Sequence, residues 1–587
     1  MKSILNLNWV STGRLLFSHI ELQRRREIYA LLFVMVIVSI LELLSIGSVM
    51  PLLAVLTNPE RFLKIGYFEE VYSFLHIGST REVMILFLGI FVATTLFAGI
   101  FRWQLLRMQV RLSYSIGIDF SVKVFKYALY LPYIEHAHLN SSEIISTIVQ
   151  KISIVIDRVV FPALTIISCS MILTLMFIAA LFSSATITVV VLTIFLFIYG
   201  VMIIFTKKIL SRNSESISKT SHKVIQEVQE ALGGIRDILI EGNQSIHIAQ
   251  YRKLDEVLRD AQGSIQLISM GPRYLVEVLG MLTLAVIAYW ATFSGEGLVA
   301  IIPALGLIAL AIQRLLPMAQ QLYNNWAYLK GSANVLQDVV QKLELTSEKE
   351  DVGVLKEGIR FENLIELENI SFRYSPGEQN ILSNISIKIR AGECIGFIGE
   401  TGGGKTTLLD LVIGLLPPTT GKLLVDGVEI GKENIGSWMS NIAHVPQNIY
   451  LSDATILENI AFGIPAESID LERVKWASEK AKIADLIESL ELNYQTRVGE
   501  NGVRLSGGQR QRIGIARALY RGGTILILDE ATSALDELTE CELMRSIEEI
   551  GADITLLIIA HRLSTLKKCN KIFEIRNGYI TEKSKIS

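Results

Sequence analysis

Long apolar stretches fill the first half of the chain and are missing from the second half. A helix needs about 20 apolar residues to cross the hydrocarbon core of a bilayer, because each residue adds about 1.5 Å. Windows of this length occur six times, at 28–56, 83–106, 159–182, 185–206, 274–293 and 297–317. Only "SS" separates the third window from the fourth, and "SGEG" separates the fifth from the sixth. The pattern predicts six membrane-spanning helices, with tight turns on one side of the membrane.

Basic residues beside these windows predict the orientation of the chain. They are Arg24, Arg25 and Arg26 before the first window, Arg107 and Arg111 after the second, and Lys207, Lys208 and Arg212 after the fourth. Because basic residues favour the cytoplasmic side, both termini are expected in the cytoplasm. The long connections 107–158 and 207–273 then also lie there, and we expect them to continue the helices out of the bilayer as arms.

The second half of the chain has a different pattern. Hydropathy falls after Asn325, and Glu344–Lys356 is a charged stretch suited to a linker. From Leu364 onward, short β-like runs alternate with helical ones, which is typical of an α/β domain. We therefore expect a transmembrane domain at 1–330, a linker at 331–363 and a separate α/β domain at 364–587.

Composition agrees with a membrane protein. The 587 residues exceed the usual size of one core, 50% of them are hydrophobic and only 19% are charged. A formal net charge of −3 gives no sign of a nucleic-acid-binding surface. No secretory signal is expected, because the first apolar run lacks a small-residue cleavage site. The cysteines Cys169, Cys394, Cys541 and Cys569 lie far apart in sequence, so ordinary reduced thiols are expected.

A glycine-rich segment follows the strand-like run Cys394–Ile398 and opens a leucine-rich helix. Its G-x-x-x-x-G-K-T sequence lets backbone N–H groups surround phosphates, and the helix N-terminus adds a positive dipole. Lys405 is expected to reach the β- and γ-phosphates of ATP, and the Thr406 hydroxyl to coordinate Mg²⁺. The expected ATP-binding residues of this segment are Gly399, Glu400, Thr401, Gly402, Gly403, Gly404, Lys405, Thr406 and Thr407.

Two acidic residues end a second buried-strand run, Ile525–Leu528. Asp529 suits the Mg²⁺ shell, and Glu530 can polarise an attacking water as a general base. The alternative is that these acids only cap the next helix. Together with the phosphate loop, they predict Mg²⁺-dependent hydrolysis of ATP.

Between these two motifs stands "LSGGQRQR", and here the sequence resembles the ATP-binding cassette (ABC) transporters. The matching signature residues are Leu505, Ser506, Gly507, Gly508 and Gln509. The resemblance implies a membrane all-α domain of six helices, of the type IV ABC exporter kind, followed by an α/β P-loop NTPase domain. It also implies that the signature of one cassette covers the nucleotide of another. We therefore expect a homodimer, with a heterodimer as the alternative.

The resemblance implies roles for further residues. Tyr374 matches the aromatic residue that stacks on adenine, Gln447 the glutamine that senses Mg²⁺ and water, and His561 the switch histidine that reaches the γ-phosphate. Asp536 matches the aspartate loop, and Glu500, in "TRVGENG", the loop that points toward the membrane arms. The turns "LPYIEHAHLNSS" and "QEALGGIRDILIEG" are expected to transmit closure of the cassettes to the membrane helices.

The cargo is predicted less sharply. Glu42 lies deep in the first window, where a charge is costly and usually functional, and Arg314 lies toward the cytoplasmic end of the sixth. Residues 59–78 have the pattern of an amphipathic helix on the outer leaflet. With "ILELLSIGSVMPLL" and "HLNSSEII", they resemble bacterial flippases of lipid-linked oligosaccharides. The alternatives are a peptide or multidrug exporter, and a nucleotide-gated channel or regulator with little turnover.

Overall fold

The computed structural model describes two compact units. The described residues are 9–49, 51–52, 55, 79–138, 140–183, 185–291, 316–347, 358–375, 377–550, 554–560, 562, 566–567 and 569–583. The first unit comprises Met1–Tyr130 and Leu139–Glu350, and the second comprises Leu131–His138 and Asp351–Ser587. The predictions for the outer segment 59–78, for most of the sixth window, and for Arg314 and His561 lie outside the described residues.

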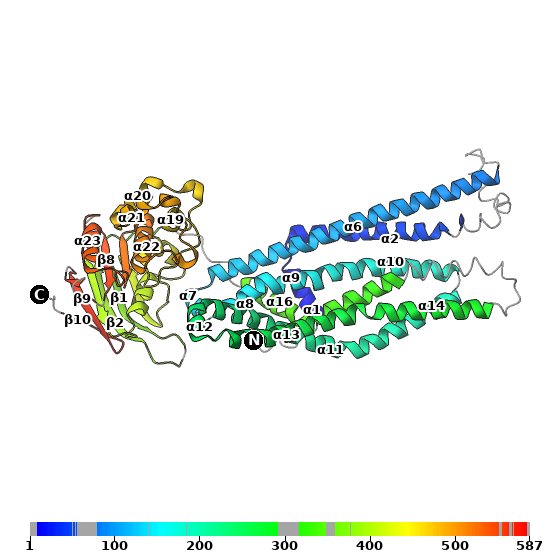
Figure 1. The fold of residues 1–587 in the computed structure, drawn as a ribbon, viewed down its shortest axis with the longest axis horizontal. Helices are drawn as coiled ribbons and strands as arrows, with labels where there is room; N and C mark the ends of the chain where they lie inside the picture. Colours follow the sequence, from blue (N-terminus) through cyan, green and yellow to red (C-terminus); the bar gives the residue numbers. More distant parts are fainter. Residues whose placement is uncertain are drawn as a thin grey trace. The chain divides into compact units, whose positions relative to one another are not determined.

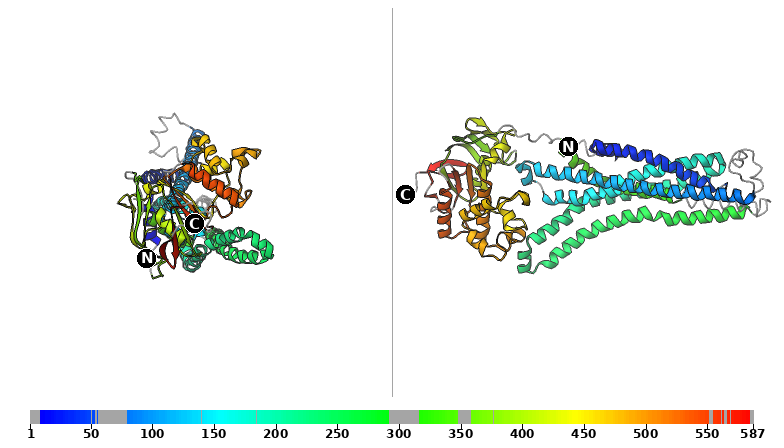
Figure 2. Two further views of the ribbon diagram at one scale, coloured as in Figure 1. Left: turned by 90° about the vertical axis from the view of Figure 1, so that its left-hand side faces the viewer. Right: turned by 90° about the horizontal axis from the view of Figure 1, so that it is seen from above.

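The described part of the first unit is helical, and its long helices run side by side (Figures 1 and 2). Its elements are α1 (Trp9–Ser18), α2 (Leu22–Gly47), α6 (Thr80–Tyr130), α8 (Ser141–Ser146), η3 (Thr147–Lys151), α9 (Ile152–Val155), η4 (Ile156–Val160), α10 (Phe161–Ser183), α11 (Ala185–Gly233), α12 (Ile235–Glu241), α13 (Gln244–Met270), α14 (Pro272–Ala291) and α16 (Ala333–Ser347). Residues 316–331 are also helical.

Two of these helices are much longer than a bilayer is thick. α6 has 51 residues and α11 has 49. At 1.5 Å per residue each extends roughly 75 Å, against a hydrocarbon core of about 30 Å. The prediction that the apolar windows continue into helical arms is therefore confirmed for α6 and α11.

Three helical stretches among the described residues are long and apolar enough to span a membrane: Leu22–Gly47, Thr80–Tyr130 and Ser141–Phe182. Large apolar side chains on them stay exposed in the chain, among them Phe33, Leu96 and Phe182. A face of this kind is stable only when something apolar covers it. In this unit the natural cover is lipid or a second membrane helix.

Buried polar contacts connect the arms to α16, which falls within the predicted linker but packs against α11 and α6. Lys151, at the end of the π-helical turn η3, donates to Asp338 of α16 at 2.5 Å. The Ser218 hydroxyl of α11 donates to the same carboxylate at 2.7 Å. Asp338 therefore joins three elements, and the Lys151 side chain is only 5% exposed.

Asp338→Ala is expected to destabilise this unit. It leaves the buried Lys151 ammonium without its carboxylate, and loss of one partner costs about 2–4 kcal/mol when the pair is mostly buried. We expect the midpoint of thermal unfolding of the detergent-purified full-length chain to fall by several degrees. Asp255→Ala is the control, because it breaks only the exposed pair with Arg259 on the same helix, worth about 0.5 kcal/mol. Equal shifts in the two variants would contradict the prediction.

The second unit contains two sheets. A four-stranded antiparallel sheet has the order β2-β1-β4-β5, and a six-stranded sheet has the order β10-β9-β3-β8-β7-β6. The six-stranded sheet is parallel except for its edge strand β10. The strands are β1 (Leu364–Phe372), β2 (Leu382–Arg390), β3 (Cys394–Gly399), β4 (Thr420–Val425), β5 (Val428–Glu429), β6 (Ile442–Val445), β7 (Ile525–Asp529), β8 (Thr555–Ile559), β9 (Lys571–Arg576) and β10 (Tyr579–Lys583).

Helices cover the six-stranded sheet and define its two cores. The longer helices are α17 (Lys405–Ile413), α20 (Leu471–Lys480), α22 (Gly507–Arg521) and α23 (Glu537–Glu548), with the short α18 (Ile435–Ser440), α19 (Ile456–Ile460) and α21 (Ala484–Ser489). One apolar cluster includes α17 and residues of both sheets, and a second includes α19 to α23 with β6 to β8. The short helix α7 (Tyr133–His138) belongs to this unit, and its Ile134 packs against the first cluster. The predicted α/β domain following a helical membrane domain is confirmed.

Candidate nucleotide site

The carboxyl ends of four neighbouring parallel strands meet at one edge of the six-stranded sheet. The phosphate loop follows β3, Asp529 ends β7, and Gln447 follows β6 after a short connection. His561 follows β8 in sequence but lies outside the described residues. Ligands of open α/β sheets bind at this edge, because loops converge there and helix N-termini face it. The fold therefore brings the candidate nucleotide residues of one cassette together from distant parts of the sequence.

The phosphate loop is shaped by glycine conformations. Gly404 precedes α17 with φ +94°, and Gly399 lies so close to β9 that a Cβ there would stand 2.3 Å from the Ile575 carbonyl oxygen. The Lys405 ammonium donates to the carbonyls of Gly399 and Glu400, both at 3.0 Å. Lys405 is 7% exposed, and these two bonds fix its ammonium group against the backbone of the phosphate loop. A phosphate at the N-terminus of α17 would meet that charge and free backbone N–H groups.

Two oxygen-bearing side chains fit a hard cation beside this loop. The Thr406 hydroxyl lies beside the carboxylate of Asp529, which is 3% exposed. Oδ1 of this carboxylate is buried without a hydrogen-bond partner among the described residues. Burial raises the pKa of Asp529, which disfavours its charged form unless a cation is near. An unsatisfied carboxylate oxygen next to a hydroxyl is a donor set that Mg²⁺ accepts.

The candidate base and the candidate glutamine are in direct contact. Gln447 Nε2 donates to Glu530 Oε2 at 2.6 Å. Glu530 adopts φ +50°, in the left-handed region that a non-glycine residue rarely occupies. Its N–H donates to the Ile559 carbonyl at 3.1 Å, so the end of β8 holds this conformation in place. The strained backbone aims the carboxylate toward Gln447.

Tyr374 follows β1 and lies near the first turn of α17. Its ring packs edge-on against Phe372 with centroids 5.0 Å apart, and its hydroxyl lies 3.5 Å from the Thr407 hydroxyl. Burial raises the pKa of Tyr133 on α7, with Asp410 and Tyr374 as further causes. α7 therefore lies near the candidate adenine-stacking residue, within the same unit.

The signature forms the N-terminus of α22. The Ser506 hydroxyl accepts from the Gln509 N–H at 3.3 Å, and the Gln509 side chain accepts from the Ser506 N–H at 2.8 Å. This capping box fixes the first turn and leaves the N–H groups of Gly507 and Gly508 pointing out of the helix end. A Cβ on Gly508 would stand 3.1 Å from the Ala534 carbonyl oxygen, a tight contact that favours glycine at this position.

The two candidate coupling residues are Asp536, at the start of α23, and Glu500, in a 3₁₀ turn. Asp536 caps α23, accepting from the Thr539 N–H at 3.1 Å and from its hydroxyl at 2.8 Å. Glu500 is exposed in a 3₁₀ turn that follows Gly499, which has φ +75°. The capping bonds of Asp536 are a structural role, and they leave the predicted coupling role untested.

Several charged residues near the site belong to no short sequence motif, so the sequence alone did not predict them. Burial raises the pKa of Asp410 on α17 to about 6, with Asp529 as the second cause. Arg562 donates to the Leu535 carbonyl at 3.1 Å and to Glu540 at 3.0 Å. Glu540 is 3% exposed and also accepts from Thr532 at 2.8 Å. This network connects the end of β8 to α23, and only the three-dimensional contacts reveal it.

The burial of His444 on β6 leads us to expect that the free energy of unfolding depends on pH. Burial lowers its pKa from 6.5 to about 4, so the unfolded chain binds more protons in the window between these values. Stability is therefore fully present above about pH 6.5 and falls as the pH drops toward 4, by about 1–2 kcal/mol at pH 5 to 5.5. We expect His444→Gln to reduce the acid-induced fall in the thermal unfolding midpoint between pH 7.5 and 5.5. An identical fall in both proteins would contradict this assignment.

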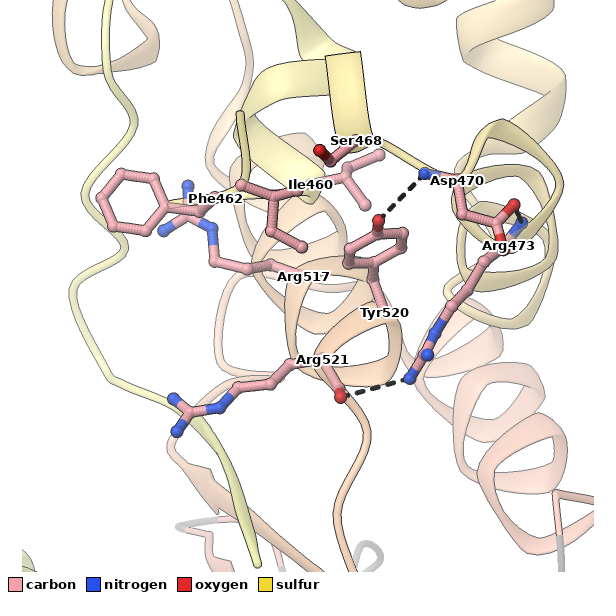
Figure 3. Close-up of a pocket in the computed structure, with 9 residues that line it drawn as sticks. Ile460, Phe462, Ser468, Asp470, Arg473, Arg517, Tyr520 and Arg521 are labelled. Atoms are coloured by element: carbon pink, nitrogen blue, oxygen red, sulfur yellow. Dashed lines mark hydrogen bonds between the residues drawn. The ribbon is translucent and has the colours of Figure 1, made fainter. Parts of the chain in front are cut away.

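A cavity of about 530 Å³ opens beside α22 on the helical side of the cassette (Figure 3). Arg517 lies with its guanidinium 4.6 Å from the Phe462 ring centroid, and Arg473 donates to the Arg521 carbonyl at 3.2 Å. The Tyr520 hydroxyl accepts from the Asp470 N–H at 3.2 Å. The lining residues are Ile460, Phe462, Ile464, Ser468, Asp470, Arg473, Arg517, Tyr520 and Arg521. The cavity therefore combines apolar walls with three cationic side chains.

In the helical unit, Glu42 is buried rather than exposed to a cavity. It is 2% exposed, and Arg102 of α6 donates to its Oε1 at 3.3 Å. The Arg102 side chain is 45% exposed. The sequence pattern pointed to Glu42 and Arg314 but not to Arg102, because the pairing of Arg102 with Glu42 depends on how α2 packs on α6.

Comparisons with known proteins agree with this geometry. The ABC transporter family model matches residues 382–533, and the ABC transporter transmembrane region matches residues 28–313. An ATP-dependent lipid A-core flippase of Pectobacterium atrosepticum is 31% identical over 402 residues, 67% of this chain and 68% of that protein. Proteins of the same name from Cupriavidus metallidurans and Haemophilus influenzae are 27% and 32% identical, covering 84% and 67% of this chain and 83% and 67% of their own lengths.

The fold is also found in a solved structure. "Structure of a bacterial Atm1-family ABC exporter with ATP bound" has a TM-score of 0.75 and 21% sequence identity, and the match covers 96% of this chain and 95% of that one. The match supports the type IV exporter-like arrangement of a helical membrane domain followed by a nucleotide-binding domain. This chain belongs to the ABC transporter family, as an exporter-type half-transporter and integral membrane protein whose ATP-binding domain is an ATPase coupled to translocation.

Proposed function

We propose that this transporter moves a lipid-linked oligosaccharide or another amphipathic lipid from the cytoplasmic to the outer leaflet of a bacterial inner membrane. The observation that carries the proposal is that one chain contains both membrane-spanning helices and a nucleotide site. That site includes the acidic residues Asp529 and Glu530, Gln447 and the signature 505–509. The lipid cargo is supported by relatives named lipid A-core flippases, which match 67% or more of the chain. Both termini are proposed to lie in the cytoplasm, as the basic residues beside the apolar windows favour.

The proposed hydrolysis follows from the site geometry. Bound Mg²⁺, held by Thr406, Asp529 and Gln447, would neutralise charge on the β- and γ-phosphates. Lys405 and the N–H groups of the phosphate loop orient those phosphates, and Tyr374 stacks on the adenine. Glu530 takes a proton from the attacking water, and Gln447 orients both the carboxylate and that water. His561 is proposed to contact the γ-phosphate.

The proposed assembly is a homodimer in which each signature completes the partner's nucleotide site. Ser506 and Gln509 exchange two hydrogen bonds at the helix cap, and the first N–H groups of an α-helix, here those of Gly507 and Gly508, have no acceptor within the helix itself. An anion arriving from outside this chain can accept from them. A γ-phosphate held by the phosphate loop of a second copy has the right charge. A heterodimer with a related chain remains the alternative.

The coupling of hydrolysis to the membrane is proposed to use the two predicted turns, Asp536 and Glu500. α7 already packs within the cassette unit through Ile134. α12, at the end of the other arm, exposes Leu239 and Ile240 by 60% and 74% beside acidic residues of the same turn. We propose that α12 of a second copy docks at the cavity of Figure 3, because that cavity offers apolar walls and arginines. Closure of the cassettes would then move both arms.

We propose that the cargo contacts Arg102, whose guanidinium is positioned by its ion pair with Glu42. A half-exposed guanidinium fixed by a buried carboxylate keeps donors available for an anionic headgroup. The pair offers a cation at membrane depth whose desolvation is partly compensated by Glu42. Arg314, outside the described residues, is proposed as a second contact.

Removal of Arg102 is expected to impair lipid transport more than ATP hydrolysis. Arg102→Ala alone leaves buried Glu42 without this cation, so Glu42→Gln/Arg102→Gln is the informative variant because it removes both charges. We expect this double variant to retain ATPase activity within about twofold and to lose about tenfold in transport, since one charge-assisted contact contributes roughly 1.4 kcal/mol. Transport is measured in vesicles as the ATP-dependent change in exposure of a fluorescent lipid-linked sugar to an outside reagent.

Arg107→Gln, further along α6, is the matched control and is expected to transport at the parent rate. Full transport by the double variant would show that the pair is only structural. If the parent protein hydrolyses ATP but never changes exposure of the sugar, this cargo is excluded and a peptide or drug pump is favoured. If the parent hardly hydrolyses ATP at all, the channel or regulator alternative is favoured.

A further inference from the structure

Two cysteines that are far apart in sequence lie side by side at the start of β3, the strand that leads into the phosphate loop. Cys394 begins β3 and Cys569 lies two residues before β9, yet their Sγ atoms lie 3.0 Å apart. The Cys394 N–H donates to Asn570 Oδ1 at 2.7 Å, and the Asn570 N–H donates to the Cys394 carbonyl at 2.7 Å. These two bonds hold the backbones of the cysteines in register. The backbone of the sheet therefore holds the two thiols next to each other.

We propose that Cys394 and Cys569 are a modification site, at which a peroxide oxidises the two thiols to a reversible disulfide that slows ATP hydrolysis. The sulfur atoms already lie within hydrogen-bond distance, so bond formation requires an approach of about 1 Å. The other cysteines offer no such geometry, because Cys541 is exposed and Cys169 is buried in the other unit. The proposal goes beyond lipid transport and holds for any cargo.

The chemistry balances with hydrogen peroxide as the oxidant. One thiolate attacks the peroxide and becomes a sulfenic acid, releasing hydroxide that takes up a proton to give water. The neighbouring thiol then displaces water from the sulfenic sulfur, so two thiols and one peroxide give one disulfide and two water molecules. The hydrogen bond from the Cys394 thiol lowers the pKa of Cys569, which favours the reactive thiolate. Cys394 is only half-buried, which gives a small oxidant a route to the pair.

The position of the pair explains why a disulfide would affect turnover. β3 leads directly into the phosphate loop, and Gly399 at its end packs against the Ile575 carbonyl of β9. Cys569 lies in the segment between β8 and β9, which also contains His561. A covalent bond would tie the start of β3 to this segment. We expect this bond to restrict movement of β3 relative to that segment, and with it movement of the phosphate loop that follows β3.

The test uses the full-length protein with Cys541→Ser, which removes the exposed thiol. After treatment with hydrogen peroxide and alkylation, the protein is digested without reduction and analysed by mass spectrometry. We expect the peptides containing Cys394 and Cys569 to be joined, about 2 Da lighter than the sum of the two thiol peptides. We also expect ATPase activity to fall about threefold or more and to return with dithiothreitol. Cys394→Ser should show neither effect.

Cys569→Ala serves as a second variant, so a folding defect in Cys394→Ser leaves the test intact. Basal ATPase activity is measured before oxidation in every protein, which separates this proposal from the proposed transport. Failure of the joined peptides to appear would overturn the modification site. A disulfide that leaves turnover unchanged, or peroxide inhibition that persists in both variants, would overturn its regulatory effect.

Discussion

Glu530→Gln is expected to lower the rate of ATP hydrolysis by about 100-fold or more, because the amide cannot take the proton of the attacking water. The substitution keeps the size of the side chain, and its amide can still face Gln447, which now donates to Glu530 at 2.6 Å. The left-handed backbone at this position is set by β7 and the bond to Ile559, so the fold should be unaffected. ATP binding is therefore expected to remain near the parent level.

The measurement is phosphate release by the purified protein, together with binding of a fluorescent ATP analogue. Glu548→Gln, on α23, is the control for loss of a carboxylate elsewhere in the cassette and should hydrolyse ATP at the parent rate. Equal and slow rates in the parent and in Glu530→Gln would refute the assignment of Glu530 as base. That result would also favour a regulator over a transporter.

A mixture of two differently tagged chains tests whether the nucleotide site is shared between copies. Lys405→Ala removes the cation of the phosphate loop, and Ser506→Arg blocks the signature with a bulky charge. Each variant alone is expected to lose about 100-fold in ATPase activity, because every site then has one defective half. A mixed dimer of the two variants combines both defects in one site and leaves the other site intact. We therefore expect it to recover substantial hydrolysis.

The matched control places both substitutions in one chain and pairs it with the parent chain. Each site then receives one defective half, so this dimer is expected to be inactive. Sites formed within a single chain would give the opposite result, with activity only in the second pairing. Dimers carrying one tag of each kind are isolated before the assay, so that parent homodimers do not contribute. Hydrolysis by isolated monomers at the full rate would also contradict the shared site.

The nucleotide-binding elements could be predicted from sequence because their physical requirements are local. A phosphate loop needs glycines that turn successive N–H groups inward, then a lysine and a hydroxyl at the start of a helix, and 399–406 contains all of them. A buried strand that ends in acids is equally visible at Asp529 and Glu530. The helical arms were also predictable, since α6 and α11 carry one continuous helical pattern through a bilayer length and beyond it.

Contacts between distant segments were not predictable in this way. Glu42 looked like an isolated charge at membrane depth, and only the packing of α2 on α6 places Arg102 against it. Cys394 and Cys569 looked like unrelated thiols, and the pairing of β3 with β9 brings them together. Residues 333–347 looked like the start of a linker, yet α16 is held to the arms by Asp338.

The sequence by itself determined that this protein spans a membrane and binds ATP, because apolar length and phosphate-loop chemistry are properties of short continuous segments. The tertiary structure decided which charges are paired, which thiols touch and which carboxylate oxygen stays unsatisfied beside Thr406. Those features depend on the order of strands in the sheet and on helix packing, where residues separated by 60 to 187 positions come within a few ångströms. No local pattern encodes such distances, since they follow from the energy of the whole packed chain.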